Sequence, residues 1–180
     1  MKSIDGRIKY TKKVIKDNLL VLLKTQSLER ITVSTLCEKA EINRATFYRH
    51  YNDCYDVIDE IEREMLNELL PLIENCNQDD IFFIITDNIK KHCEIYTSIS
   101  SANCDPYFSE KIMRLCYKEK QEHIKTAFPN LSETQCHWLY EYFAHGCAGV
   151  ISCWIANGLK ESTNDIAKFI SQIIKVTLSK

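Results

Sequence analysis

The sequence predicts an all-α protein. Its 180 residues include only four glycines and three prolines, which leaves few residues for the turns that a β-rich fold requires. Apolar residues recur at helical spacing along most of the chain, and no segment alternates with the two-residue period of a strand. The length suits a small module of about 50 residues fused to a larger helical body.

Three helices are expected near the N-terminus. The first covers Ile8–Lys24, where apolar side chains share one face and lysines lie largely on the others. Thr32 can cap a short second helix over Val33–Ala40. After a three-residue turn, Asn43 can cap a third helix over Arg44–His50. Two short helices joined by a tight turn form a helix-turn-helix.

Longer helices are expected in the rest of the chain. Prolines at 71, 106 and 129 mark breaks between them. Ser132 and Gln135 stand at the spacing of a capping box, and Gly158 can end the helix that follows. The expected helices run from Asp53 to about Leu70, from Asp79 to about Ser100, from Tyr107 to about Ala127, from Ser132 to Gly158, and from Ser162 to the C-terminus.

Charge divides the chain into two parts. Residues 1–51 contain 11 Lys and Arg against 5 Asp and Glu, or +6, which leaves 12 against 20, or −8, for residues 52–180. Although a solvated basic face is the simplest reading of a charge excess, a change of sign at a module boundary favours a polyanionic partner, with nucleic acid the leading candidate. We expect a DNA-binding domain over 1–51 and a regulatory and dimerisation domain over 52–180, joined without a flexible linker.

The nine cysteines predict a reducing environment. Their number is odd, they are spread evenly, and none forms a Cys-x-x-Cys pair, so small buried hydrophobes are expected rather than disulfides or a zinc finger. Redox or metal sensing is the alternative. No apolar run approaches the roughly 18 residues of a membrane span, and no signal peptide is visible. A cytoplasmic protein without a membrane partner is expected.

Residues 28–58 read LERITVSTLCEKAEINRATFYRHYNDCYDVI. This segment resembles the DNA-binding domain of the TetR/AcrR family, and the resemblance covers about the first 60 residues. It implies a homodimeric transcriptional regulator, a ligand-responsive repressor that binds a near-palindromic double-stranded operator. The residues that carry it most strongly are Ala40, Ile42, Asn43, Thr46, Phe47, Tyr48, His50 and Tyr51.

The resemblance also implies roles for individual side chains. Those expected at base edges are Ser34, Arg44, Ala45 and Arg49, and those expected at the DNA backbone are Thr46, Tyr48 and His50. Tyr48 and His50 could instead simply brace the module. The residues expected to form its small core are Leu36, Cys37, Ala40, Ile42 and Phe47.

Two positions depart from the family pattern. Glu41 stands where the family favours glycine in the turn, and a left-handed conformation there costs about 1 kcal/mol. Cys54 stands where the family usually has a lysine that reaches a phosphate. That contact is in doubt unless Asn52, Tyr55 or the N-terminal lysines replace it.

The resemblance assigns the last two helices to a four-helix bundle with a second subunit. Phe143, Val150, Trp154 and Ile170 are therefore expected at the dimer interface, although the same helices could bury one another within one subunit. Between them and the N-terminal module, His92, Tyr96, Phe108 and Cys116 offer aromatic groups with polar tips, as a small-molecule effector pocket requires. An ordinary core would contain the same residues.

Other functional classes find less support. His137, Glu141 and His145 lie four apart on one expected helix, but such histidines are more often packed or exposed than ligated, so neither metal nor cofactor is expected. An enzyme is not expected, because the chain lacks a glycine-rich phosphate loop, a nucleophile elbow and a paired-carboxylate motif. The remaining alternative is a TetR-like coactivator that acts mainly through a protein partner.

Overall fold

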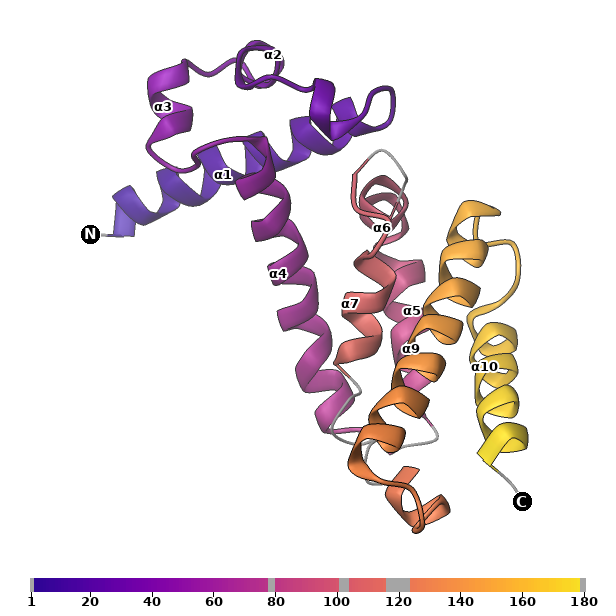
Figure 1. Ribbon diagram of the computed structural model, residues 1–180. Coiled ribbons are helices and arrows are strands. Elements are labelled where there is room, and N and C mark those ends of the chain that lie inside the picture. The colour runs from indigo at the N-terminus through magenta and orange to yellow at the C-terminus, as the bar shows by residue number, and fades with distance from the viewer. Residues whose placement is uncertain (1, 78–79, 101–103, 116–123, 179–180) are drawn as a thin grey trace.

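The computed structural model describes residues 2–77, 80–100, 104–115 and 124–178. This part of the chain is helical and contains no strand, as the sequence predicted. Figure 1 shows a small head built from the N-terminal helices and a body built from the later ones, with α4 running from one to the other. The elements are α1 (Lys2–Leu23), η1 (Leu28–Arg30), α2 (Val33–Lys39), α3 (Arg44–Tyr48), α4 (Cys54–Glu74), α5 (Ile81–Lys91), α6 (Cys93–Ile99), α7 (Phe108–Arg114), α9 (Glu133–Ala156) and α10 (Thr163–Leu178).

The predicted caps of the head helices are all present. Thr32 Oγ1 accepts a hydrogen bond from the Thr35 N–H at 3.1 Å at the start of α2. Asn43 begins α3 in the same way, and Asp53 Oδ1 accepts from the Asp56 N–H at 2.9 Å at the start of α4. Each side chain satisfies a backbone donor that the first helical turn leaves free. The starts of these helices are thus set locally.

The head has the small core that was predicted. Leu36, Cys37, Ala40 and Phe47 are buried, and Ile42 packs against them from a partly exposed position. The helix-turn-helix is shorter than expected, because α3 ends at Tyr48 and the next two residues form a turn. The first helix is longer, since α1 already begins at Lys2.

The connecting helix α4 does not end near Pro71, and this prediction was wrong. It continues to Glu74, one turn further. Proline lacks an amide donor and costs most in a helix interior. Here Ile73 holds the last turn in the core at 2% exposure, and Asn75 Nδ2 donates to the Pro71 carbonyl at 2.7 Å. Packing of the final turn thus outweighs the local break.

Two further predicted helices are divided or shortened. The one expected up to Ser100 breaks at His92, whose φ of −109° and ψ of 33° separate α5 from α6. No glycine or proline marks this break. The helix expected from Tyr107 ends, as α7, at Arg114, and residues 116–123 lie outside the described residues. No helix in the described part of the chain is long and apolar enough to cross a membrane.

Helices α9 and α10 run side by side at one side of the body (Figure 1). The predicted capping box starts α9, and Gly158, with φ +79°, stands just beyond its end. The turn that follows is tied to α5, because Lys90 Nζ donates to the Leu159 carbonyl at 2.7 Å. Thr86 Oγ1 donates to the Thr163 carbonyl at 3.1 Å. The pair α9–α10 is therefore anchored to the rest of the body.

Candidate nucleic-acid interface

The helix α3 turns one face inward and one face outward. Phe47 is fully buried and anchors the helix in the head. Asn43 Oδ1 accepts from both the backbone N–H and the hydroxyl of Thr46, at 2.7 and 2.9 Å. On the outward face, Arg44 and Ala45 are exposed and Tyr48 is 51% exposed. A short, firmly held helix thus presents side chains to solvent.

The other residues expected at DNA differ in exposure. Ser34 is exposed on α2 and Arg49 is exposed just beyond the end of α3, whereas His50 is half-buried. The Arg44 guanidinium lies over the Tyr48 ring, 5.9 Å from its centroid, with Nη2 3.5 Å from the phenol oxygen. Such stacking restricts the arginine before any partner arrives.

The two departures from the family pattern have visible consequences. Glu41 has φ +53°, so a side chain does occupy a left-handed position in the turn. Cys54 is 3% exposed, and burial raises the pKa of its thiol to about 11. A buried, neutral thiol cannot take over a lysine's contact with phosphate. Tyr55, which follows it, is 51% exposed.

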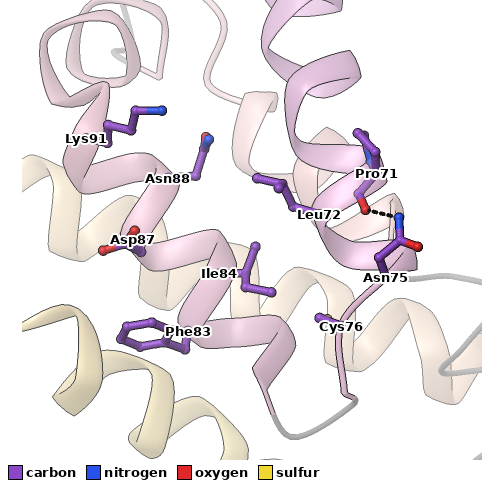
Figure 2. A pocket seen from close by; sticks show the side chains of 9 residues that line it. All are labelled: Pro71, Leu72, Asn75, Cys76, Phe83, Ile84, Asp87, Asn88 and Lys91. Carbon is purple, nitrogen blue, oxygen red and sulfur yellow. Dashed lines mark hydrogen bonds between the residues drawn. The ribbon is translucent and has the colours of Figure 1, made fainter.

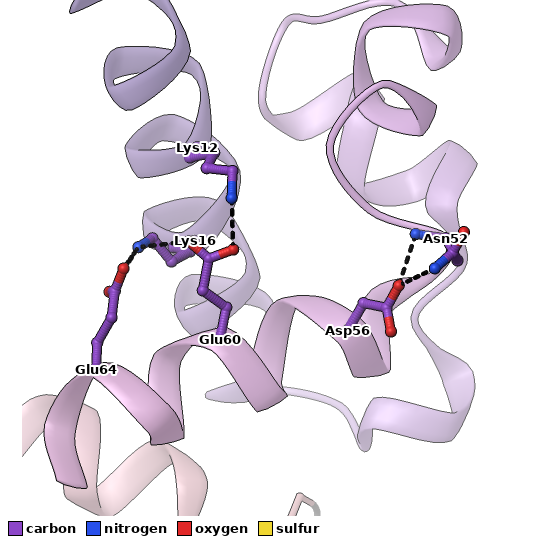
Figure 3. Close-up of polar contacts among 6 residues, drawn as sticks. All are labelled: Lys12, Lys16, Asn52, Asp56, Glu60 and Glu64. Carbon is purple, nitrogen blue, oxygen red and sulfur yellow. Dashed lines mark hydrogen bonds and ion pairs between the residues drawn. The ribbon is translucent and has the colours of Figure 1, made fainter. Parts of the chain in front are cut away.

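Two of the N-terminal lysines are engaged with the connecting helix. Lys12 Nζ lies 2.8 Å from Glu60 Oε2, and Lys16 Nζ lies 2.6 Å from Glu64 Oε2 (Figure 3). Lys12 also lies over the Tyr51 ring, 5.2 Å from its centroid. These contacts join α1 to α4 and make the head and the start of α4 one unit. They leave Lys12 and Lys16 poorly placed to replace the missing phosphate contact.

Two of the residues expected at the dimer interface are buried within the chain itself, which corrects that expectation. Trp154 is 2% exposed, and its Nε1 donates to the Glu161 carbonyl at 3.2 Å. Ile170 is 1% exposed. Phe143 and Val150 are partly buried and pack against the core of the same chain. Contacts with α5 and α7, which spacing along one helix does not reveal, decide which face is inward.

A different set of side chains forms the exposed surface of these helices. Five large apolar residues are 43–75% exposed, and we call them the α9–α10 apolar face: Trp138, Tyr142, Phe169, Ile173 and Val176. On α9 they continue at helical spacing into Gly146 and Gly149, which are also exposed. The spacing of Trp138 and Tyr142, four apart, was the signal in the sequence that could have identified this face.

The residues expected in an effector pocket are partly packed together. Tyr96 and Phe108 are fully buried, with ring centroids 5.7 Å apart. His92 is half-buried, and its Nε2 lies 3.1 Å from Glu68 Oε1. Cys116 lies outside the described residues. Of the four residues expected in the pocket, the structure therefore brings Tyr96 and Phe108 together, and both are core residues.

A groove of about 580 Å³ lies nearby between the end of α4 and α5 (Figure 2). Apolar and polar side chains line it from both the end of α4 and α5. Asn88 connects it to the buried aromatic pair, because Asn88 Oδ1 accepts from the Tyr96 hydroxyl at 2.8 Å. The lining residues are Pro71, Leu72, Asn75, Cys76, Phe83, Ile84, Asp87, Asn88 and Lys91.

The histidines on α9 belong to a surface network of charges. His145 Nε2 lies 3.5 Å from Glu141 Oε2, and His137 Nε2 lies 3.9 Å from Glu141 Oε1. Arg114 donates to both oxygens of the same carboxylate, at 3.1 and 3.3 Å. In the described residues no group of three or more His, Cys, Asp or Glu side chains is arranged to hold a metal ion.

Similar folds occur among solved structures. The chain superimposes on a TetR transcriptional regulator from Streptococcus agalactiae with a TM-score of 0.74, at 17% identity, over 96% of this chain and 98% of that one. The TM-score is 0.60 for the dihydroxyacetone kinase operon activator DhaS, at 19% identity over 93% and 96%. It is 0.57 for the fatty acid degradation regulator FadR from Bacillus halodurans, at 11% identity over 91% and 93%. These likenesses establish the fold.

Two sequence comparisons match segments of the chain to transcriptional regulators. A stretch of 51 residues is 33% identical to YxbF of Bacillus subtilis (strain 168), an uncharacterized HTH-type transcriptional regulator; it spans 28% of this chain and only 13% of that protein. The TetR model of a transcriptional regulator C-terminal region matches residues 76–176, more than half of the chain. The chain therefore belongs to the TetR family of transcriptional regulators.

Proposed function

We propose that this regulator binds a near-palindromic DNA operator as a homodimer and acts as a ligand-responsive repressor. The observation that carries the proposal is the outward face of α3, a capped helix anchored by Phe47 that leaves Arg44, Ala45 and Tyr48 exposed. A short helix of this kind fits the major groove of DNA. The net charge of +6 on residues 1–51 supports a polyanionic partner for this domain.

The side chains around α3 have distinct proposed roles. Ser34, Arg44, Ala45 and Arg49 meet base edges, where either arginine can pair with a guanine. Thr46, Tyr48 and His50 contact phosphates, which adds affinity but little sequence preference. Thr46 reaches a phosphate by turning its hydroxyl proton from Asn43 Oδ1 to the phosphate oxygen, while its backbone N–H keeps Asn43 as the cap.

The second subunit covers the α9–α10 apolar face. An exposed set of large apolar side chains on two adjacent helices marks a protein interface when it forms one patch. Gly146 and Gly149 have no heavy atom within 4 Å of an added Cβ, so the α9 surface is open for a close approach by another helix. A twofold pairing of α9 and α10 gives a four-helix bundle.

The effector occupies the body next to α4. The groove of Figure 2 is a candidate for its entrance, since its wall includes Asn88, which holds the hydroxyl of the buried Tyr96. A ligand that displaces α5 relative to α4 changes the tilt of α4. Because the ion pairs of Lys12 and Lys16 fix α4 to the head, the spacing of the two α3 helices changes too. The ligand therefore weakens DNA binding, and DNA weakens ligand binding by the same factor.

Selection from a random pool of DNA duplexes tests the proposed function. The purified chain should retain a near-palindromic site whose half-sites lie on one face of the duplex, one helical turn or a multiple apart. Its affinity should fall steeply as salt increases, because phosphate contacts release counterions. Retention of no sequence in preference to any other, at moderate salt, would contradict the proposal.

A further inference from the structure

Glu62 places a carboxyl group in the apolar face of α4. It follows Ile61 and stands four residues after Ile58 and three before Met65, all of which are buried. Its side chain is 6% exposed, and it is the one Asp, Glu, Lys or Arg in the described residues that is buried. A carboxylate in such a place is costly unless it is paired and hydrogen-bonded.

The pairing of Glu62 is incomplete. Lys111 Nζ, from α7, lies 2.6 Å from Glu62 Oε2 and 2.6 Å from Asp105 Oδ2. The second oxygen, Glu62 Oε1, is buried and has no hydrogen-bond partner. Two carboxyl groups therefore share one ammonium group, and the set carries a net charge of −1 when both are ionised. We call Glu62, Asp105 and Lys111 the Glu62 cluster.

Proton uptake would neutralise this cluster at Glu62. Burial, with a smaller contribution from Asp105, raises the pKa of Glu62 to about 7 against the opposing effect of Lys111. Burial also acts on Asp105, but hydrogen bonds from Lys111 and the Tyr107 N–H hold its pKa below the usual value. Among the described residues, the Cys104 thiol also interacts with Glu62 and Asp105, and its pKa is raised, chiefly by burial. Within the cluster, Glu62 is thus the group that titrates near neutral pH.

We propose that the Glu62 cluster makes the contact between α4 and α7 sensitive to pH. A proton on Glu62 stabilises the packed arrangement, because the neutral carboxyl can stay buried and can donate to Asp105. Loss of the proton favours an arrangement in which the carboxylate of Glu62 reaches water. Because α4 carries the head, the two arrangements place α3 differently and change the affinity for DNA. This effect on affinity rests on the proposed DNA-binding function.

The sign of the effect on stability follows from linkage. The folded chain holds the Glu62 proton up to about pH 7, whereas an unfolded glutamate releases it near its ordinary pKa of about 4.5. Between these values the folded state binds more protons than the unfolded state. The contribution of Glu62 to stability is therefore greatest at low pH and declines as the pH rises to about 7.

Thermal unfolding between about pH 5.5 and about pH 8.5 tests the cluster itself. Glu62→Gln, which mimics the protonated group, should unfold at a higher temperature than the natural chain above neutral pH and should flatten the decline of stability with pH. The matched control is Glu74→Gln, an exposed position at the end of the same helix, which should keep the natural profile. A Glu62→Gln chain with an unchanged pH profile would overturn the proposal.

A second variant tests the charge argument without altering Glu62. Asp105→Asn removes the neighbouring negative charge but keeps the oxygen that accepts from the Tyr107 N–H at 2.8 Å. The midpoint of the pH dependence should then move to lower pH, because ionised Glu62 no longer faces a second carboxylate. A role in packing alone would leave the midpoint in place, and that result would also count against the cluster as a pH-sensitive element.

Affinity for a selected DNA fragment over the same pH range tests the coupling to the head. The natural chain should show a change of about fivefold or more that Glu62→Gln lacks and Glu74→Gln retains. Equal pH dependence in all three chains would refute the coupling, even where the stability profile behaves as expected. Failure to select any DNA would instead refute the proposed function, and the unfolding measurements would still decide the case for the cluster.

Discussion

The head and the body of this regulator determine their exposed faces in different ways. In the head, Asn43 caps α3 and Phe47 anchors it, so the outward residues follow from a few neighbouring positions. In the body, α9 and α10 each carry large apolar side chains that point inward and others that point outward, and each buries one face against helices from distant parts of the sequence. Local chemistry thus fixes the proposed DNA-binding surface, whereas tertiary packing fixes the proposed subunit interface.

The largest expected effect distinguishes the two faces of α10. Ile170→Asp places a charge where the side chain is 1% exposed, and an unpaired buried charge costs several kcal/mol. This variant should lose its folded body, as seen in circular dichroism. Ile173→Asp, at 43% exposure on the same helix, should stay helical but become monomeric in light scattering.

Leu72→Asp provides the control for that pair. Leu72 is 47% exposed on α4, so this change adds the same charge to the surface outside the α9–α10 apolar face. It should leave the chain dimeric. If Ile173→Asp remains dimeric while Ile170→Asp remains folded, both the proposed interface and the contrast between the two faces are wrong.

A smaller effect is expected at the cap of α3. Asn43→Ala removes the acceptor for two groups of Thr46 and should lower the free energy of unfolding by about 1 kcal/mol. Asn43→Asp keeps an acceptor oxygen and should retain most of that stability. Chemical denaturation measures both. Equal stability of the alanine variant and the natural chain would show that α3 depends on packing as the body helices do.

The smallest expected effect is at the turn between α2 and α3. Glu41 has φ +53°, a conformation that glycine adopts without the steric cost of a side chain. Glu41→Gly should therefore raise the free energy of unfolding, by up to about 1 kcal/mol. Denaturation midpoints of the two chains give the answer, and a loss of stability would mean that the Glu41 side chain makes a favourable contact in the turn.

These differences explain how far the sequence predicts the molecule. The all-helical fold, the helix-turn-helix and the capped helix starts could be predicted because each depends on residues within one or two turns. Helix α4 was wrongly expected to end near Pro71, since burial of Ile73 outweighs the missing amide. The break at His92 carries no glycine or proline. The inward faces of Trp154 and Ile170 depend on where other helices lie, which periodicity does not specify.

The same reasoning applies to the two proposed binding sites. The expected DNA-binding residues lie on or beside a short helix, so their shared location followed from their spacing. The expected effector residues come from separate helices, and two of them, Tyr96 and Phe108, pack on each other in the core. The groove beside Asn88 arises from the packing of α4 on α5 and has no counterpart in the local sequence.

The central claim is that the outward face of α3 reads DNA sequence. The most direct measurement is binding of a selected site and of its single-base variants by the natural chain, Arg44→Ala and Arg49→Ala. In each arginine variant the binding free energy for the selected site should weaken by about 1–3 kcal/mol, and the preference at particular base pairs should be lost. Arg63→Ala, which removes an exposed arginine from α4, should keep the natural preference. Unchanged affinity and preference in the Arg44→Ala, Arg49→Ala double variant would contradict the claim.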